Sequence, residues 1–145
     1  MEDGTDIPLQ QVGALPYRFT AAGEAELLLV TSRGTRQWII PKGWPIDGLT
    51  RAESAAREAY EEAGLLGDID GVAAGYFSYD KVRKGDETPL RLSVEVFWLR
   101  VERQLTFWPE ASQRDLVWVS PAQALSIITN PSLADLIAGV RFPSV

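Results

Sequence analysis

Three carboxylates in one short segment are the residues best suited to chemistry in this sequence. Glu58, Glu61 and Glu62 are spaced i, i+3 and i+4, so a helix would place them on one face. Like charges this close repel one another, and a helix face built for solubility usually mixes signs. A divalent cation would relieve the repulsion, because carboxylate oxygens are its preferred ligands. An isolated pattern of this kind is more often a solvated acidic face, so the surrounding sequence has to decide.

The composition limits which chemistry these carboxylates can join. The chain contains no cysteine and no histidine, which excludes thiolate metal sites, cysteine nucleophiles and imidazole bases. Any metal must be held by oxygen, so the expected cofactor is a hard cation such as Mg²⁺ or Mn²⁺. Any general base must be a carboxylate or, as a weaker alternative, a lysine or tyrosine. The net charge of −6 argues against nucleic acid as a partner.

The length of 145 residues suits a single domain over residues 1–145. No apolar run approaches the roughly 18 residues that a membrane span needs, so no membrane partner is expected. The acidic N-terminus lacks the basic and apolar regions of a signal peptide. We therefore expect a cytoplasmic protein.

A helix over residues 50–63 is predicted to carry the carboxylates. Thr50 and Glu53 match a capping box, in which each side chain bonds the backbone N–H of the other residue. Gly64 is placed to end the helix. Arg57 can pair with Glu53 or Glu61 at a spacing of four residues, which would hold one carboxylate in place.

The rest of the chain reads as strands with helices between and after them. Alternating apolar residues from position 90 onward indicate a half-buried strand. The predicted strands cover residues 12–19, 25–31, 37–40, 71–79, 90–101 and 115–119, the further helices cover 122–128 and 133–140, and loops cover 42–48 and 81–88. This order indicates a mixed α/β or α+β domain.

Residues 43–65 resemble the Nudix box, G-x5-E-x7-R-E-U-x-E-E-x-G-U, where U is aliphatic. The matching residues are Gly43, Arg57, Glu58, Glu61, Glu62, Gly64 and Leu65. Two positions depart from the pattern, since Leu49 replaces the first glutamate and Ala59 occupies the first U position. In the family that glutamate braces the loop against the helix, so Leu49 puts the rigidity of the loop in question more than metal binding. The capping box could compensate.

The resemblance implies an α/β/α sandwich with a mixed β-sheet and the hydrolysis of a pyrophosphate compound with Mg²⁺ or Mn²⁺. It assigns Glu58, Glu61 and Glu62 as metal ligands, the carbonyl of Gly43 as a further ligand, and Arg57 as the residue that orients the carboxylates. Water attacks the phosphoanhydride bond, with Glu61 or Glu62 as general base unless the base lies outside the box. Because family members often dimerise, the resemblance also raises a homodimer.

Two flanking blocks, residues 36–45 and 108–118, resemble the diphosphoinositol polyphosphate phosphohydrolase branch and its bacterial relatives. This implies a small phosphorylated substrate, either a diphosphoinositol polyphosphate or a dinucleoside polyphosphate. One alternative is an ADP-ribose or nucleoside triphosphate pyrophosphatase. Another is a non-catalytic Nudix-fold module that binds a ligand, although such modules usually lose box carboxylates.

Basic residues near the box are candidates for substrate binding. Arg33, Arg36 and Lys42 surround the loop before the box, and a second basic cluster at residues 81–84 contributes Lys84. Such cations could form a rim for phosphates, and Arg36 and Lys42 are favoured because they adjoin the metal loop. For residues 81–84, ordinary solvated loop charge is an equal alternative.

Aromatic and acidic residues outside the box give weaker candidates. Trp44 is the best candidate for stacking on a nucleobase, with Trp38 and Tyr79 as alternatives, although packing is the commoner role of such residues. Glu95 and, more weakly, Glu110 could serve as an extra metal ligand or base, or simply face solvent.

Overall fold

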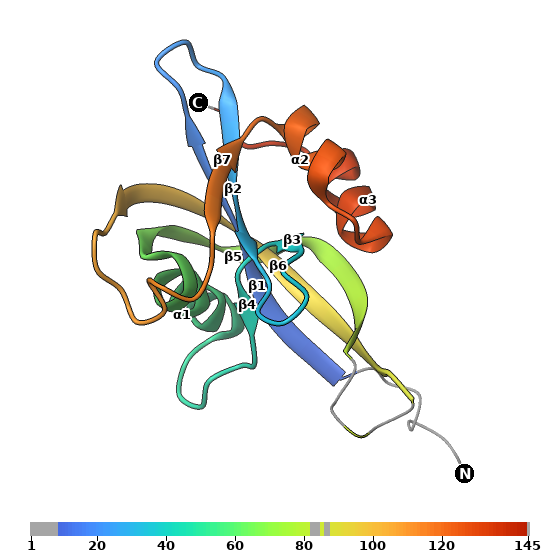
Figure 1. Cartoon of the computed structure of the whole chain (residues 1–145). Coiled ribbons are helices and arrows are strands. Elements are labelled where there is room, and N and C mark those ends of the chain that lie inside the picture. Colours follow the sequence, from blue (N-terminus) through green and yellow to red (C-terminus); the bar gives the residue numbers. More distant parts are fainter. Residues whose placement is uncertain (1–8, 82–84, 86–87, 145) are drawn as a thin grey trace.

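A mixed seven-stranded sheet runs through the centre of the protein in the computed structural model, which describes residues 9–81, 85 and 88–144 (Figure 1). The elements are β1 (Leu9–Phe19), β2 (Ala25–Thr31), β3 (Trp38–Ile39), β4 (Lys42–Gly43), α1 (Arg51–Ala63), β5 (Leu65–Lys81), β6 (Leu90–Gln104), β7 (Leu116–Val119), α2 (Pro121–Ile127) and α3 (Pro131–Gly139).

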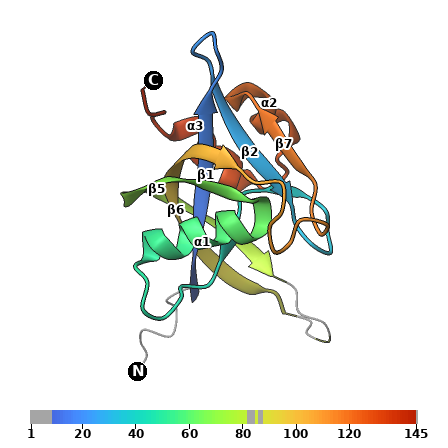
Figure 2. The same ribbon diagram turned by 90° about the vertical axis from the view of Figure 1, so that its left-hand side faces the viewer.

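The main path of the sheet is β3-β2-β1-β6-β5, with β4 paired to β1 and β7 paired to β2. The two central strands β1 and β6 are parallel, and the other pairs are antiparallel. Helix α1 covers one face, and α2 and α3 cover the other (Figures 1 and 2). The α/β/α sandwich with a mixed sheet is therefore confirmed.

Each face of the sheet has its own apolar core. On one face, the alanines of α1 pack against β1 and β2, where Val12 and Leu28 are fully buried. On the other face, Leu133 and Ile137 of α3 belong to the same buried core as Leu15 of β1. Alanine side chains let the helix backbone lie close to the sheet, which fixes α1 and its carboxylates relative to β1.

The ends of α1 follow the sequence prediction. Thr50 accepts a hydrogen bond from the backbone N–H of Glu53, and the Glu53 carboxylate accepts one from Thr50, so the capping box is present. Gly64 ends the helix in the left-handed conformation with φ 69°, which glycine adopts without the steric cost of a Cβ. The ring of Trp108 lies against this glycine, where a Cβ would overlap it.

Two predictions of secondary structure were wrong in part. Lys42–Gly43, predicted as loop, forms β4 and pairs with Val12 and Gly13 of β1. Strand β5 begins at Leu65, directly after the helix, instead of at residue 71. Both differences come from pairing with distant strands, which local sequence does not reveal.

None of the helices in the described part of the chain has the length and apolar character needed to cross a bilayer.

Candidate functional site

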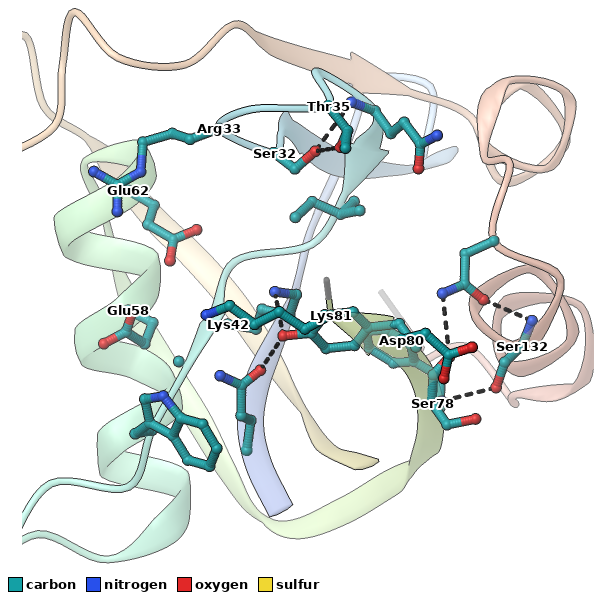
Figure 3. A pocket seen from close by; sticks show the side chains of 18 of the residues that line it. Ser32, Arg33, Thr35, Lys42, Glu58, Glu62, Ser78, Asp80, Lys81 and Ser132 are labelled. Atoms are coloured by element: carbon teal, nitrogen blue, oxygen red, sulfur yellow. Dashed lines mark hydrogen bonds between the residues drawn. The ribbon is translucent and has the colours of Figure 1, made fainter. Parts of the chain in front are cut away.

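A cavity of about 1120 Å³ opens between α1, the start of α3, strand β5 and the loop before β4 (Figure 3). Glu58 and Glu62 of α1 line one side, and Ser78 and Ser132 line the opposite side. The cavity is large for a small-molecule site. Acidic, basic and neutral polar groups therefore face one shared space.

Glu58 and Glu62 present their carboxylates to this cavity. Glu62 is only 3% exposed, and its Oε1 is buried without a hydrogen-bond partner. The Glu58 carboxylate lies so close to Gly43 that a Cβ on that residue would overlap it. Burial raises the pKa of both carboxyl groups, and their mutual proximity contributes to the rise for Glu62. The two carboxylates therefore repel each other when both are ionised, and a bound cation would relieve this repulsion.

Glu61 has a different environment. Its Oε2 accepts a hydrogen bond from Nε of Arg57 at 3.0 Å, the i, i+4 pair expected from the sequence, and it does not line the cavity. Within residues 9–81, 85 and 88–144, no three acidic side chains are grouped as a ready metal site. The paired carboxylates and the unpartnered oxygen of Glu62 nevertheless fit a hard divalent cation, because its ligands are oxygens.

Lys42 reaches the same cavity from β4. Its Nζ donates to the hydroxyl of Tyr79 at 3.0 Å, and that hydroxyl donates to Oε1 of Gln11 at 2.7 Å. Burial lowers the pKa of Lys42 to about 8, with the charge of Glu62 opposing the shift. Burial, followed by the charge of Glu62, raises the pKa of Tyr79 to about 12. The Tyr79 hydroxyl that accepts from Lys42 therefore stays protonated at neutral pH, and the Gln11 amide that holds this hydroxyl carries no charge.

A segment before β7 clamps the C-terminal end of α1. Trp108 donates from Nε1 to the carbonyl of Glu62 at 3.2 Å, and the backbone N–H of Glu110 donates to the carbonyl of Glu61 at 3.0 Å. Arg114 pairs with the carboxylate of Glu110 at 3.0 Å. The last turn of the helix, which carries two of the box glutamates, is therefore fixed through its own carbonyl groups.

A sequence model of the NUDIX domain matches residues 9–139 of the chain. The chain belongs to the Nudix family. Two Arabidopsis thaliana relatives are Nudix hydrolase 21, chloroplastic, which is 34% identical, and Nudix hydrolase 17, mitochondrial, which is 32% identical. The alignments cover 83% and 79% of this chain but 60% and 64% of the relatives, so the chain spans less than two thirds of their length.

Solved Nudix structures share the fold. A C. elegans Ap4A hydrolase superposes with a TM-score of 0.65 at 22% identity, covering 90% of this chain and 93% of the other. The NUDIX domain of Shewanella oneidensis NrtR, complexed with ADP ribose, superposes with a TM-score of 0.66 at 16% identity, covering 94% and 90%. At these identities the likeness concerns the fold alone.

The loop over residues 44–50, between β4 and α1, is held in place without the first box glutamate. Leu49 occupies that position and is 40% exposed. The backbone N–H of Ile46 instead donates to the hydroxyl of Ser54 in α1 at 2.9 Å, and the capping box fixes the junction with the helix. The serine bond was not anticipated from the sequence.

The predicted substrate contacts are separated in the Nudix fold. Arg33, Lys42 and Trp44 line the cavity, and Trp44 is 45% exposed. Arg36 does not line it, and its guanidinium pairs with the carboxylate of Asp115 at 2.6 Å. Lys84 lies outside the residues that the structure describes.

Of three further polar residues, the sequence analysis named Glu95 and Glu110 as candidates. Glu95 does not line the cavity and binds Arg51 and the hydroxyl of Tyr76. Glu110 does line the cavity. Asn130 at the start of α3 was missed altogether, although the sequence Asn-Pro before an apolar helix is a cap signal.

Asn130 builds the wall opposite the carboxylates. Its Oδ1 accepts from the backbone N–H groups of Ser132 and Leu133, and its Nδ2 donates to the carbonyl of Ser78 at 3.1 Å. The hydroxyl of Ser132 accepts from the N–H of Ser78 at 2.9 Å. The start of α3 is therefore joined to β5 by two side-chain hydrogen bonds, one to the N–H and one to the carbonyl of Ser78.

Proposed function

We propose that this chain is a metal-dependent pyrophosphohydrolase that cleaves a phosphoanhydride bond by attack of water. The observation that carries the proposal is the pair of carboxylates, Glu58 and Glu62, that face one cavity beside Gly43 while a buried oxygen of Glu62 lacks a partner. Membership of the Nudix family supports it. A buried carboxylate oxygen without a partner lowers the stability of the fold unless a bound ligand interacts with it.

The box residues would hold Mg²⁺ or Mn²⁺. Glu58 and Glu62 already face the cavity, and the carbonyl of Gly43 and the carboxylate of Glu61 would complete the set. For Glu61 this requires a side-chain rotation away from Arg57. The cation supplies charge neutralisation at the phosphoanhydride and makes an attacking water more acidic.

The protein's own groups bind and orient the substrate. Lys42 and Arg33 provide positive charge for phosphate oxygens on the open side of the carboxylate pair. Glu62 or Glu61 would accept a proton from the attacking water. Tyr79 is less suitable as the base, because burial and the charge of Glu62 keep its hydroxyl protonated. Arg57 would hold the carboxylate of Glu61 in place until the cation binds.

We propose a diphosphoinositol polyphosphate or a dinucleoside polyphosphate as the substrate. A cavity of about 1120 Å³ has room for a large moiety beyond the phosphates, and the exposed ring of Trp44 is available for stacking. ADP-ribose and nucleoside triphosphates remain the alternative, and a non-catalytic binding module is the alternative from another class. Retention of all three helix carboxylates favours the enzyme.

The cytoplasmic location and the homodimer stay predictions. The plant relatives carry chloroplastic and mitochondrial designations, so the location of this protein needs its own measurement. Sedimentation analysis would determine the oligomeric state.

The test is a hydrolysis assay with Mg²⁺ or Mn²⁺. The panel contains a diphosphoinositol polyphosphate, diadenosine polyphosphates, ADP-ribose and nucleoside triphosphates, and Glu62→Gln is the inactive control. Metal-dependent turnover that collapses in the variant establishes the activity and its substrate class. Tight binding of a panel member without turnover would support the binding module instead.

A further inference from the structure

A single arginine lies between the acidic groups of the cavity and the sheet. The side chain of Arg114 is 8% exposed. Its Nε lies 3.0 Å from Oε1 of Glu110 and 3.8 Å from Oε1 of Glu62. Its Nη1 donates to the carbonyl of Thr31, at the end of β2, at 3.0 Å. One guanidinium therefore links α1, the sheet and the segment before β7.

We propose that Arg114 is a positioning residue that holds the carboxylate of Glu62 in the orientation needed to bind a divalent cation. This inference rests on the proposed function, because it concerns the same carboxylate pair. It assigns a task to a residue of the segment 108–118, which lies outside the Nudix box.

The guanidinium of Arg114 is held in place by the protein, at the edge of the cavity that the residue helps to line. A guanidinium carries its donors in a rigid planar fork. The bonds to Glu110 and to the backbone of Thr31 fix that plane, and the side chain is only 8% exposed. By contrast, Arg33 is exposed, and its guanidinium bonds the side chain of Gln113.

Glu62 needs such a neighbour. Its Oε1 is buried and accepts no hydrogen bond, and the charge of Glu58 acts on it as well. A buried carboxylate without a cationic partner tends to move to solvent or take up a proton. Arg114 is the cation that the structure places against this oxygen, at 3.8 Å.

The helix turn itself does not depend on Arg114. The bonds from Trp108 to the Glu62 carbonyl and from the Glu110 N–H to the Glu61 carbonyl hold the backbone. Loss of the guanidinium should therefore release the side chain of Glu62 while α1 keeps its place.

Charge and position make different predictions for cation binding. If Arg114 acted only through its charge, Arg114→Lys would bind a divalent cation as the wild type does, because lysine keeps that charge. If it positions Glu62, removing it weakens binding, as loss of groups that orient metal ligands usually does by about 10- to 100-fold.

The experiment measures Mn²⁺ binding to the full chain by electron paramagnetic resonance of free Mn²⁺, without substrate. The variants are Arg114→Met and Arg114→Lys. Arg18→Met is the matched control, since Arg18 pairs with Glu26 at 2.9 Å and does not line the cavity. Ser120→Ala, which removes the cap of α2, controls for lost stability.

We expect Mn²⁺ affinity to fall by about 10- to 100-fold in Arg114→Met and by less in Arg114→Lys, which keeps the charge but loses the fork. Both controls should bind as the wild type does. Unchanged or tighter binding in Arg114→Met overturns the inference, and so does unchanged binding in Arg114→Lys, which remains informative if Arg114→Met does not fold. Failure of the wild type to bind Mn²⁺ would instead overturn the proposed function.

Discussion

The ammonium group of Lys42 and the phenol of Tyr79 form a fixed unit in the cavity. Nζ of Lys42 lies 3.0 Å from the hydroxyl oxygen and 4.2 Å from the centre of the ring, and the hydroxyl is in turn held by Gln11. The three residues come from β4, β5 and β1. A cation that is ordered before the substrate arrives loses less entropy when it binds a phosphate.

We expect Tyr79→Phe to raise KM by about tenfold with little change in kcat, which corresponds to a loss of about 1.4 kcal/mol, as for one hydrogen bond to a charged group. Steady-state kinetics on the best substrate of the panel measures this. Tyr76→Phe is the matched control, because the hydroxyl of Tyr76 bonds Glu95 outside the cavity. An equal KM in the two variants would contradict the prediction.

Gly43 allows the Glu58 carboxylate to lie against the backbone of β4. A Cβ at this position would overlap the carboxylate, and the flexible glutamate would move away. We expect Gly43→Ala to keep its thermal stability but to lose about 100-fold in kcat/KM, since displacement of a reacting geometry by about 1 Å has that effect. Gly71→Ala is the control, because nothing lies near its Cβ. Full activity in Gly43→Ala would show that the position of Glu58 is not critical.

The carboxylate pair also predicts how metal affects stability. Mg²⁺ or Mn²⁺ at a hundredfold excess over its Kd should stabilise the folded chain by about 2.7 kcal/mol, and a chelator should reverse this. In Glu58→Gln the metal-induced shift should be largely lost. Without metal, that variant should be more stable than the wild type, because burial and, less strongly, the charges of Glu61 and Glu110 raise the pKa of Glu58.

Thermal unfolding followed by scanning fluorimetry measures both effects. Glu24→Gln, in the exposed turn before β2, serves as the control and should shift as the wild type does. A metal-induced shift of full size in Glu58→Gln would contradict the assignment of this residue as a ligand.

The sequence predicted the parts of the molecule that depend on local spacing. The capping box joins Thr50 and Glu53, and the ion pair joins Arg57 and Glu61, so each interaction links residues no more than four positions apart. Both are present, as is the helix end at Gly64. These features arise from the geometry of a single helix. Local reasoning was therefore sufficient for α1 and its carboxylate face.

Features that arise from distant pairing were not predicted. Residues 65–71, rich in glycine and aspartate, look like a loop, yet residues 65–69 pair with β6, with a register shift between Leu66 and Gly67. The alternation along β6 placed Glu95 on a polar face correctly but gave no sign of its partner Arg51. Likewise, Gln11, Tyr79 and Asn130 meet at the cavity only through the fold.

The last prediction concerns the loop that lacks the first box glutamate. The hydroxyl of Ser54, fully buried in α1, accepts from the backbone N–H of Ile46 at 2.9 Å. Its removal leaves a donor unsatisfied, so we expect Ser54→Ala to lower the free energy of unfolding by about 1–3 kcal/mol and to reduce kcat/KM through a looser loop. Urea unfolding and kinetics test this, with the exposed Ser112→Ala as control. Because Ser54 already braces the loop, Leu49→Glu should change kcat/KM little, and a large gain in that variant would show instead that the loop of the natural protein is poorly held.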